Sequence, residues 1–271
     1  METLSSNSPC DQGDGELNDQ IIRRRSPIAL RYLVPNILTI LAICAGVSAI
    51  RLAIEQKFEQ AILLIVIAVV LDGLDGRVAR IMNGSSNFGA QMDSLADVIN
   101  FGVAPALIVY TYTLQQMKQV GWVAVLVYCI ACCLRLARFN IMLESSKAPS
   151  WQKEYFVGVP APAGALLVML PVYLGFLGVA PNHMWAVLFS GYTVIVAYLL
   201  VSRLPVWNGK MIGVRLRRDF VVPLLLFIVA YAGFMATYTW HTLTITAFAY
   251  IVFLPCSYFA FYKRNGKRAE P

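Results

Sequence analysis

Four aspartates, Asp72, Asp75, Asp93 and Asp97, fall within 26 residues of a strongly apolar chain. The first two are three positions apart and the last two are four apart, so each pair shares one face of a helix. The polar stretch 83–87 between them is typical of a short turn, which lets two antiparallel helices direct both pairs at one volume. Carboxylates packed together repel unless cations lie among them, and hard oxygen ligands suit Mg²⁺ or Mn²⁺. The spacing therefore predicts a divalent-metal site able to act on phosphate groups.

Small and basic residues next to these aspartates fit phosphate chemistry. Gly76 and Ala79 are three apart and leave a bare strip beside the acids, where a flat ring or a phosphate can approach the backbone. Arg80 is placed to pair with a phosphate. Two other hypotheses stay open at this stage. One is a buried ion-pair network with Arg77 and Arg80; the other is a cation channel or proton-coupled transporter, although that would spread its acids over several spans.

The elements that position these residues are expected to be membrane-spanning helices. Of the 271 residues, 58% are hydrophobic and 14% charged, and the mean hydropathy is +0.64. A span needs about 20 apolar residues. We therefore predict an all-α polytopic fold with about eight transmembrane helices, formed from a six-helix core and two further helices. The predicted spans are roughly 32–54, 58–82, 94–114, 120–143, 157–179, 184–207, 220–240 and 242–262.

The aspartates are expected at membrane depth. The apolar run 61–71 covers only about 16 Å of a hydrocarbon core about 30 Å thick. The second helix must therefore continue through Asp72 and Asp75 before it leaves the bilayer. Carboxylates at that depth are expected to face a wet cavity inside the protein.

The basic residues indicate the orientation. With eight spans, all of the 22 Lys and Arg except Arg51, Lys57 and Lys118 fall on one side, which the positive-inside rule makes cytoplasmic together with both termini. The polar segment 1–27 is expected to be a disordered cytoplasmic tail, and 28–271 one membrane-embedded domain. Because the basic residues flank spans, their predicted partner is anionic lipid and not nucleic acid.

The spacing of these residues resembles a known family. Asp72-x2-Asp75-Gly76-x2-Ala79-Arg80-x8-Gly89-x3-Asp93-x3-Asp97 is similar at every fixed position to the motif of CDP-alcohol phosphatidyltransferases. The resemblance implies a six-helix core, a divalent metal, Mg²⁺ or Mn²⁺, and a CDP-activated lipid substrate. It implies that all four aspartates serve the metal, with Asp97 also the general base. The implied CDP-diacylglycerol contacts are Asn36, Thr39, Gly76, Ala79, Arg80 and Ser86, the first two from the segment Pro35–Thr39.

Wider similarity suggests the acceptor alcohol. The stretches DSLADVINFGVAPAL, RLARFN, VGVPAPAGA and LVSRLPVWNGK resemble bacterial membrane-embedded serine-using members of the family. The implied reaction transfers a phosphatidyl group from CDP-diacylglycerol to L-serine in the bacterial inner membrane, and the implied assembly is a homodimer. Arg135, Arg138 and Asn140 are the candidate alcohol-binding residues, with orientation or structural pairing as the alternative for the arginines. Glycerol 3-phosphate, inositol or choline as acceptor, or a non-catalytic lipid-binding or transport protein, remain the other hypotheses.

Overall fold

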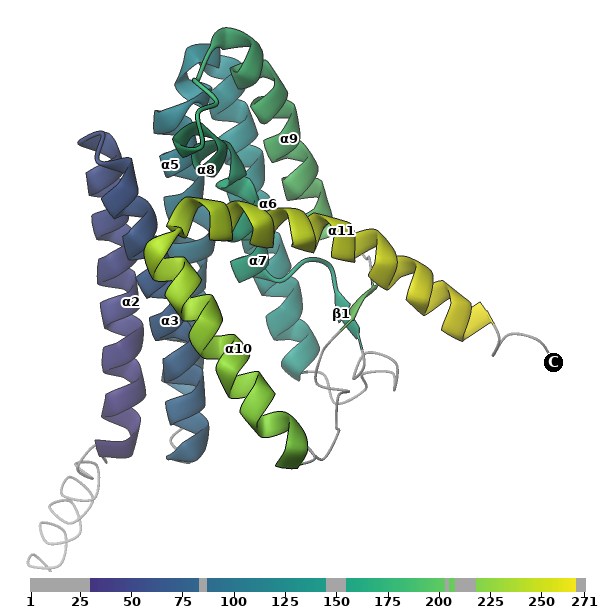
Figure 1. Ribbon diagram of the computed structural model, residues 1–271. Helices are drawn as coiled ribbons and strands as arrows, with labels where there is room; N and C mark the ends of the chain where they lie inside the picture. Colours follow the sequence, from purple (N-terminus) through teal and green to yellow (C-terminus); the bar gives the residue numbers. More distant parts are fainter. Residues whose placement is uncertain (1–29, 83–86, 145–154, 203–204, 208–217, 267–271) are drawn as a thin grey trace, which may run out of the picture.

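The computed structural model describes residues 30–82, 87–144, 155–202, 205–207 and 218–266, so the predicted tail 1–27 and the candidate Ser86 lie outside the described residues. Almost every described residue is helical (Figure 1). The helices are α2 (Leu30–Ile54), α3 (Phe58–Ile81), α4 (Asn87–Asp97), the π-helical η1 (Val98–Val103), α5 (Ala104–Tyr112), the 3₁₀-helical η2 (Leu114–Met117), α6 (Gln119–Glu144), α7 (Ala161–Val168), α8 (Leu170–Phe176), α9 (His183–Val201), α10 (Arg218–Thr237) and α11 (Thr239–Gly266). Strands β1 (Tyr155–Val157) and β2 (Pro205–Trp207) pair antiparallel.

The predicted all-α polytopic architecture is confirmed. Within the described ranges, five helical segments are long and apolar enough to cross a bilayer: Leu33–Ile54, Phe88–Tyr112, Gln119–Met142, His183–Val201 and Thr239–Phe259. The other three predicted spans correspond to α3, to the α7–α8 pair and to α10. α3 has the length of a span at 24 residues, but its aspartates and arginines interrupt the apolar pattern. The apolar part of α10 is shorter, Val222–Thr237.

Two predicted spans differ in detail from the observed helices. Segment 157–179 is two short helices that meet at Met169, where Pro171 in the first turn of α8 has no backbone N–H to continue the ladder. In segment 184–207 the helix ends at Val201, and the last residues of the segment form β2.

Glycine is required at position 158. Its φ is +84°, and an added Cβ would lie 2.8 Å from the carbonyl oxygen of Leu200.

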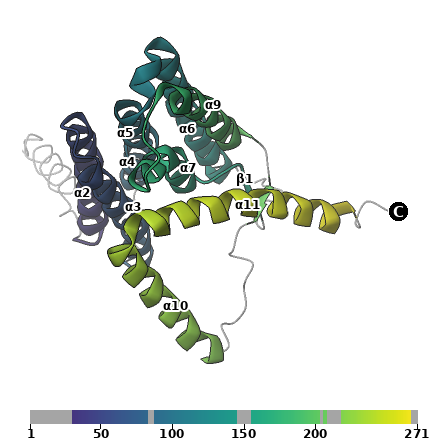
Figure 2. The same cartoon turned by 45° about the horizontal axis from the view of Figure 1, so that its top comes forward.

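The helices form an upright bundle with one helix laid across it. α2 and α3 pack side by side as an antiparallel pair, and α6 packs along η1 and α9 (Figure 1). In both views α11 runs across the bundle, and α10 leans away from it (Figure 2). The inward face of α11 carries the buried residues Leu243, Ala247 and Leu254, whose spacing is that of an amphipathic helix. This face seats α11 on α7, α8 and β2.

A π-helical turn directly follows the last of the four aspartates. Such a turn disturbs the i to i−4 hydrogen-bond ladder, so carbonyl groups must find other partners. The buried hydroxyl of Tyr128 donates to the carbonyl oxygen of Phe101 at 2.8 Å, and the Cys129 thiol donates to that of Gly102 at 3.7 Å. These bonds fix α6 against η1 and so set where the rest of α6 lies relative to Asp97.

Candidate active site

Three of the predicted aspartates converge, as their spacing requires. Asp72 and Asp75 on α3 and Asp93 on α4 each offer a carboxylate oxygen, and these oxygens all lie within 4.8 Å of one another. Asp75 is buried and the other two are half-buried. The structure therefore brings the Asp72 and Asp75 face of α3 together with Asp93 of α4 at one volume.

Helix α2 holds one of these carboxylates in place. Thr39 Oγ1 donates to Asp75 Oδ2 at 2.7 Å and also lies 3.1 Å from the carbonyl oxygen of Pro35, one turn earlier on its own helix. Both side chains are nearly inaccessible, at 4% and 3% exposed. Asp75 Oδ1 is buried and has no hydrogen-bond partner among the described residues. That oxygen is free to bind a cation.

Asp97 lies next to the three-aspartate cluster. Its carboxyl group is close enough to that of Asp72 for a hydrogen bond, and Arg135 of α6 is the basic group near it. Its Oδ1 is buried without a hydrogen-bond partner in the part of the chain that the structure describes. Asp97 therefore lies near both the three-aspartate cluster and Arg135 of α6.

The cluster fits a divalent cation better than an ion-pair network. Arg77 and Arg80 are exposed, and the salt bridges found among the described residues join Glu55 to Arg51 and Lys57 in the α2–α3 turn. None of them neutralises an aspartate. Several carboxylate oxygens at short range, one of them without a partner, are the donor set expected of a Mg²⁺ or Mn²⁺ site.

The described candidates for nucleotide contacts lie in the last part of α3 and in the first part of α2. No atom lies within 4 Å of where a Cβ of Gly76 would stand, so the strip beside the acids is open. Arg80 is exposed, and Ala79 and Asn36 are half-buried. The Thr39 hydroxyl, in contrast to these open positions, is hydrogen-bonded to Asp75 and to the Pro35 carbonyl oxygen of its own helix.

The three candidate alcohol-binding residues separate along α6. Arg135 faces Asp97, with its guanidinium 6.0 Å from the centre of the Phe139 ring. Arg138 donates instead to the carbonyl oxygens of Val201 and Ser202, at 2.9 Å and 3.3 Å, and so caps the end of α9. These contacts favour the structural alternative for Arg138.

Asn140 is tied to the residue that follows the third aspartate. Its Nδ2 donates to Ser94 Oγ at 2.9 Å, and Ser94 Oγ in turn donates to the carbonyl oxygen of Ala90 at 3.1 Å. The amide of Asn140 therefore links α6 to α4 beside Asp93.

Two polar residues that the sequence reasoning missed border this region. Asn100, in η1, is fully buried, its side chain has no hydrogen-bond partner among the described residues, and it lies against Gly46 of α2. Tyr250 of α11 is close to Arg135. A polar residue in an apolar span was the available signal for Asn100. Tyr250 carried no such signal, because its neighbour lies 115 positions earlier in the chain.

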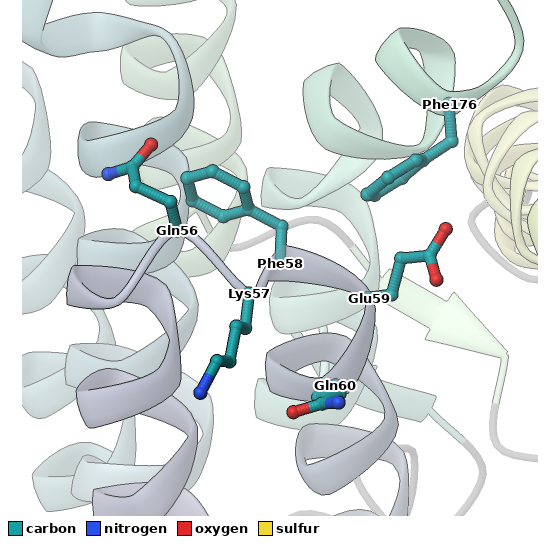
Figure 3. Close-up of a pocket in the computed structure, with 6 residues that line it drawn as sticks. All are labelled: Gln56, Lys57, Phe58, Glu59, Gln60 and Phe176. Carbon is teal, nitrogen blue, oxygen red and sulfur yellow. The ribbon is translucent and has the colours of Figure 1, made fainter.

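One open hollow lies away from the aspartates. It has a volume of about 320 Å³ and is lined by residues of the α2–α3 turn and the start of α3, together with Phe176 (Figure 3). Asp72 and Asp75 lie in the second half of α3, and Asp93 and Asp97 lie on α4. This hollow is not part of the acidic site.

Comparison with known proteins decides the family. The profile of a family described as CDP-alcohol phosphatidyltransferase matches residues 32–192, and that of CDP-alcohol phosphatidyltransferase 2 matches residues 219–255. The chain belongs to the CDP-alcohol phosphatidyltransferase family. The first match contains all four aspartates as well as Thr39 and Arg135, and the second contains Tyr250.

Curated relatives of this family member carry a more specific name. A protein of Mycobacterium leprae named CDP-diacylglycerol–serine O-phosphatidyltransferase is 39% identical over 251 residues, which cover 92% of this chain and 81% of the relative. A Helicobacter pylori (strain J99) protein of the same name is 39% identical over 203 residues, covering 75% of this chain and 84% of the relative. A third, from Bacillus subtilis, is 38% identical over 138 residues, covering 51% and 74%.

Proposed function

We propose that this chain transfers a phosphatidyl group from CDP-diacylglycerol to L-serine, releasing CMP and forming phosphatidylserine. The observation that carries the proposal is the convergence of Asp72, Asp75 and Asp93 in a member of this family, with Asp97 beside them. The relatives named for the serine reaction support the choice of acceptor.

Asp72, Asp75 and Asp93 are proposed to hold the divalent metal, Mg²⁺ or Mn²⁺, because their oxygens lie within 4.8 Å of one another. Asp97, which the resemblance also implies for the metal, lies beside these three and is proposed chiefly as the base. When bound, the metal supplies positive charge that stabilises the pyrophosphate during transfer. The chain's own contribution is to keep the three carboxylates oriented, and Thr39 does this for Asp75 through its 2.7 Å hydrogen bond. We therefore assign Thr39 to positioning a ligand.

Asp97 is proposed as the general base. It removes the proton from the serine hydroxyl, whose oxygen then attacks the β-phosphorus, the one that carries the diacylglycerol. The bond between that phosphorus and the bridging oxygen breaks, and CMP leaves with the electron pair. Asp97 is suited to this role because it stands next to the three-aspartate cluster with one buried oxygen unpartnered among the described residues.

Arg135 is proposed to bind the acceptor, and the open strip at Gly76 and Ala79 the nucleotide. Asn36, Arg80 and Ser86 complete the proposed nucleotide side. Arg135 lies beside Asp97, so a small alcohol whose hydroxyl meets the base can reach the guanidinium with its own acidic group. Because Arg138 and Asn140 already bond to other parts of the protein, we now propose them as residues that hold the site together.

The site is proposed to open to the cytoplasm of a bacterial cell, in a multi-pass protein of the inner membrane that can form a homodimer. The distribution of Lys and Arg supports this orientation. Serine and CMP would exchange with water there, while the acyl chains of the lipid stay in the bilayer.

The test is CMP release by purified protein with CDP-diacylglycerol and Mg²⁺ or Mn²⁺. Serine, glycerol 3-phosphate, inositol and choline are compared as acceptors, and Asp97→Asn is the inactive control. Metal-dependent release with serine alone supports the proposal. Release with another alcohol would replace the acceptor, and no release with any of them would favour a lipid-binding or transport protein.

A further inference from the structure

The C-terminal helix α11 reaches the acceptor side of the site. Its inward face is marked by the buried residues Leu243, Ala247 and Leu254, and Tyr250 is half-buried against the same core. The Tyr250 side chain lies near Arg135 of α6. The separately matched segment 219–255 therefore places a hydroxyl near the proposed acceptor-binding arginine.

Two buried polar atoms of these residues have no hydrogen-bond partner in the described part of the chain. They are Arg135 Nε and the hydroxyl oxygen of Tyr250. Buried polar atoms are almost always paired, because leaving one unpaired costs free energy. Arg135 and Tyr250 come from separate helices and lie within electrostatic range of each other, so a ligand that reaches both would supply the missing acceptor.

The other candidate side chains of α6 are already bonded within the protein, so Arg135 and Tyr250 are the groups proposed to bind the ligand. Arg138 donates to the carbonyl oxygens of Val201 and Ser202, and Asn140 donates to Ser94. Arg135 is the one of these α6 side chains that lies beside Asp97. A guanidinium Nε–H only donates and a phenol O–H can donate, so an anion with two acceptor oxygens would satisfy both atoms at once.

The size of the acceptor makes a carboxylate the matching anion. In an α-amino acid with a β-hydroxyl, two carbon atoms separate the hydroxyl oxygen from the carboxyl carbon. A hydroxyl held at Asp97 therefore extends the carboxylate toward Arg135, which lies within electrostatic range of Asp97. We propose that Tyr250, together with Arg135, binds the carboxylate of the amino-acid acceptor and so makes α11 part of the acceptor site. The proposal rests on the serine transfer proposed above.

The experiment compares wild type with Tyr250→Phe, which removes only the hydroxyl. Tyr198→Phe is the matched control, because its side chain is 72% exposed on α9. Losing a hydrogen bond to a charged group should raise the KM for serine roughly tenfold or more. The KM for CDP-diacylglycerol should stay unchanged, and kcat should change less than the KM for serine. Serine should also raise the thermal midpoint of wild type in detergent, and do so less in Tyr250→Phe.

A second acceptor separates ligand binding from a structural effect. Ethanolamine has the hydroxyl and the amine but no carboxylate, so Tyr250→Phe should leave turnover of ethanolamine unchanged and lower the preference for serine over ethanolamine. Equal losses with both acceptors, or an unchanged KM for serine, would overturn the role of Tyr250 while leaving the serine reaction standing. If wild type releases no CMP with serine, the proposed function fails, and this inference fails with it.

Discussion

The hydroxyl of Thr39 on α2 donates a 2.7 Å hydrogen bond to Asp75 on α3, and both side chains are buried. This bond joins the first described helix to the acidic hairpin. The other oxygen of Asp75 is buried, without a hydrogen-bond partner among the residues described. Residues that hold a metal ligand commonly change metal affinity by 10- to 100-fold when altered.

Thr39→Val should therefore raise the metal concentration that gives half-maximal activity by about 10- to 100-fold. Valine keeps the shape of threonine but leaves Asp75 without its donor. The measurement is a titration of activity with Mn²⁺ and with Mg²⁺ at saturating CDP-diacylglycerol. Thr39→Ser keeps the hydroxyl and should titrate like wild type. An unchanged titration for Thr39→Val would show that the bond does not position a ligand.

The aspartates should divide into two groups by their effect on metal binding. Asp93→Asn removes a carboxylate from the three-residue cluster and should abolish the rise in thermal midpoint that Mn²⁺ produces in detergent. Asp97→Asn should keep most of that rise while lowering kcat by about 10²- to 10⁴-fold, as loss of a general base does. Near-normal kcat in Asp97→Asn would contradict the assignment of the base.

Ser94 and Asn140, which are joined by a hydrogen bond beside Asp93, should act as one unit. Ser94→Ala and Asn140→Ala each break the same 2.9 Å hydrogen bond between α6 and α4. Their effects on kcat/KM should therefore be non-additive, with a coupling of about 0.5–3 kcal/mol in a double-mutant cycle. Strictly additive losses would show that the two side chains act independently.

Gly46 should be intolerant of a side chain because α2 passes directly over Asn100. A Cβ at Gly46 would collide with the Asn100 side chain, which is fully buried in η1. Gly46→Ala should destabilise the protein by about 1–3 kcal/mol, seen as a lower thermal midpoint in detergent. Gly191→Ala is the control, since nothing lies within 4 Å of its added Cβ. Equal midpoints for the two variants would show that α2 can shift away from η1 at little cost.

The acidic hairpin was the most predictable part of the site. Helical spacing alone puts Asp72 with Asp75 and Asp93 with Asp97, and a short turn then forces the two faces together. The same spacing rule could not predict that Arg135 and Arg138 have different partners. They are three positions apart, yet one faces Asp97 and the other donates to the end of α9. Which partner each arginine finds depends on where α9 ends, and a hydrophobicity pattern does not give that.

The changes of helix type and direction inside the predicted spans could not be predicted from the sequence either. Apolar runs show where a helix can form but not where its hydrogen-bond ladder changes, so the π-helical turn after Asp97 and the junction at Met169 were missed. The path of α11 across the bundle depends on the packing of its inward face against α7, α8 and β2, which the sequence encodes only through contacts distant along the chain. For the same reason, Tyr250 could not be linked to Arg135 from the sequence.

We expect the three-aspartate cluster to carry out a metal-dependent transfer to serine. The most direct test supplies purified protein with CDP-diacylglycerol, Mn²⁺ and an equimolar mixture of serine, glycerol 3-phosphate, inositol and choline, and identifies the lipid product by mass. Phosphatidylserine as the main product, lost on chelation of the metal and in Asp93→Asn, is the predicted result. A different phospholipid would overturn the choice of serine, and phosphatidylserine formed equally by Asp93→Asn would overturn the role of the three aspartates.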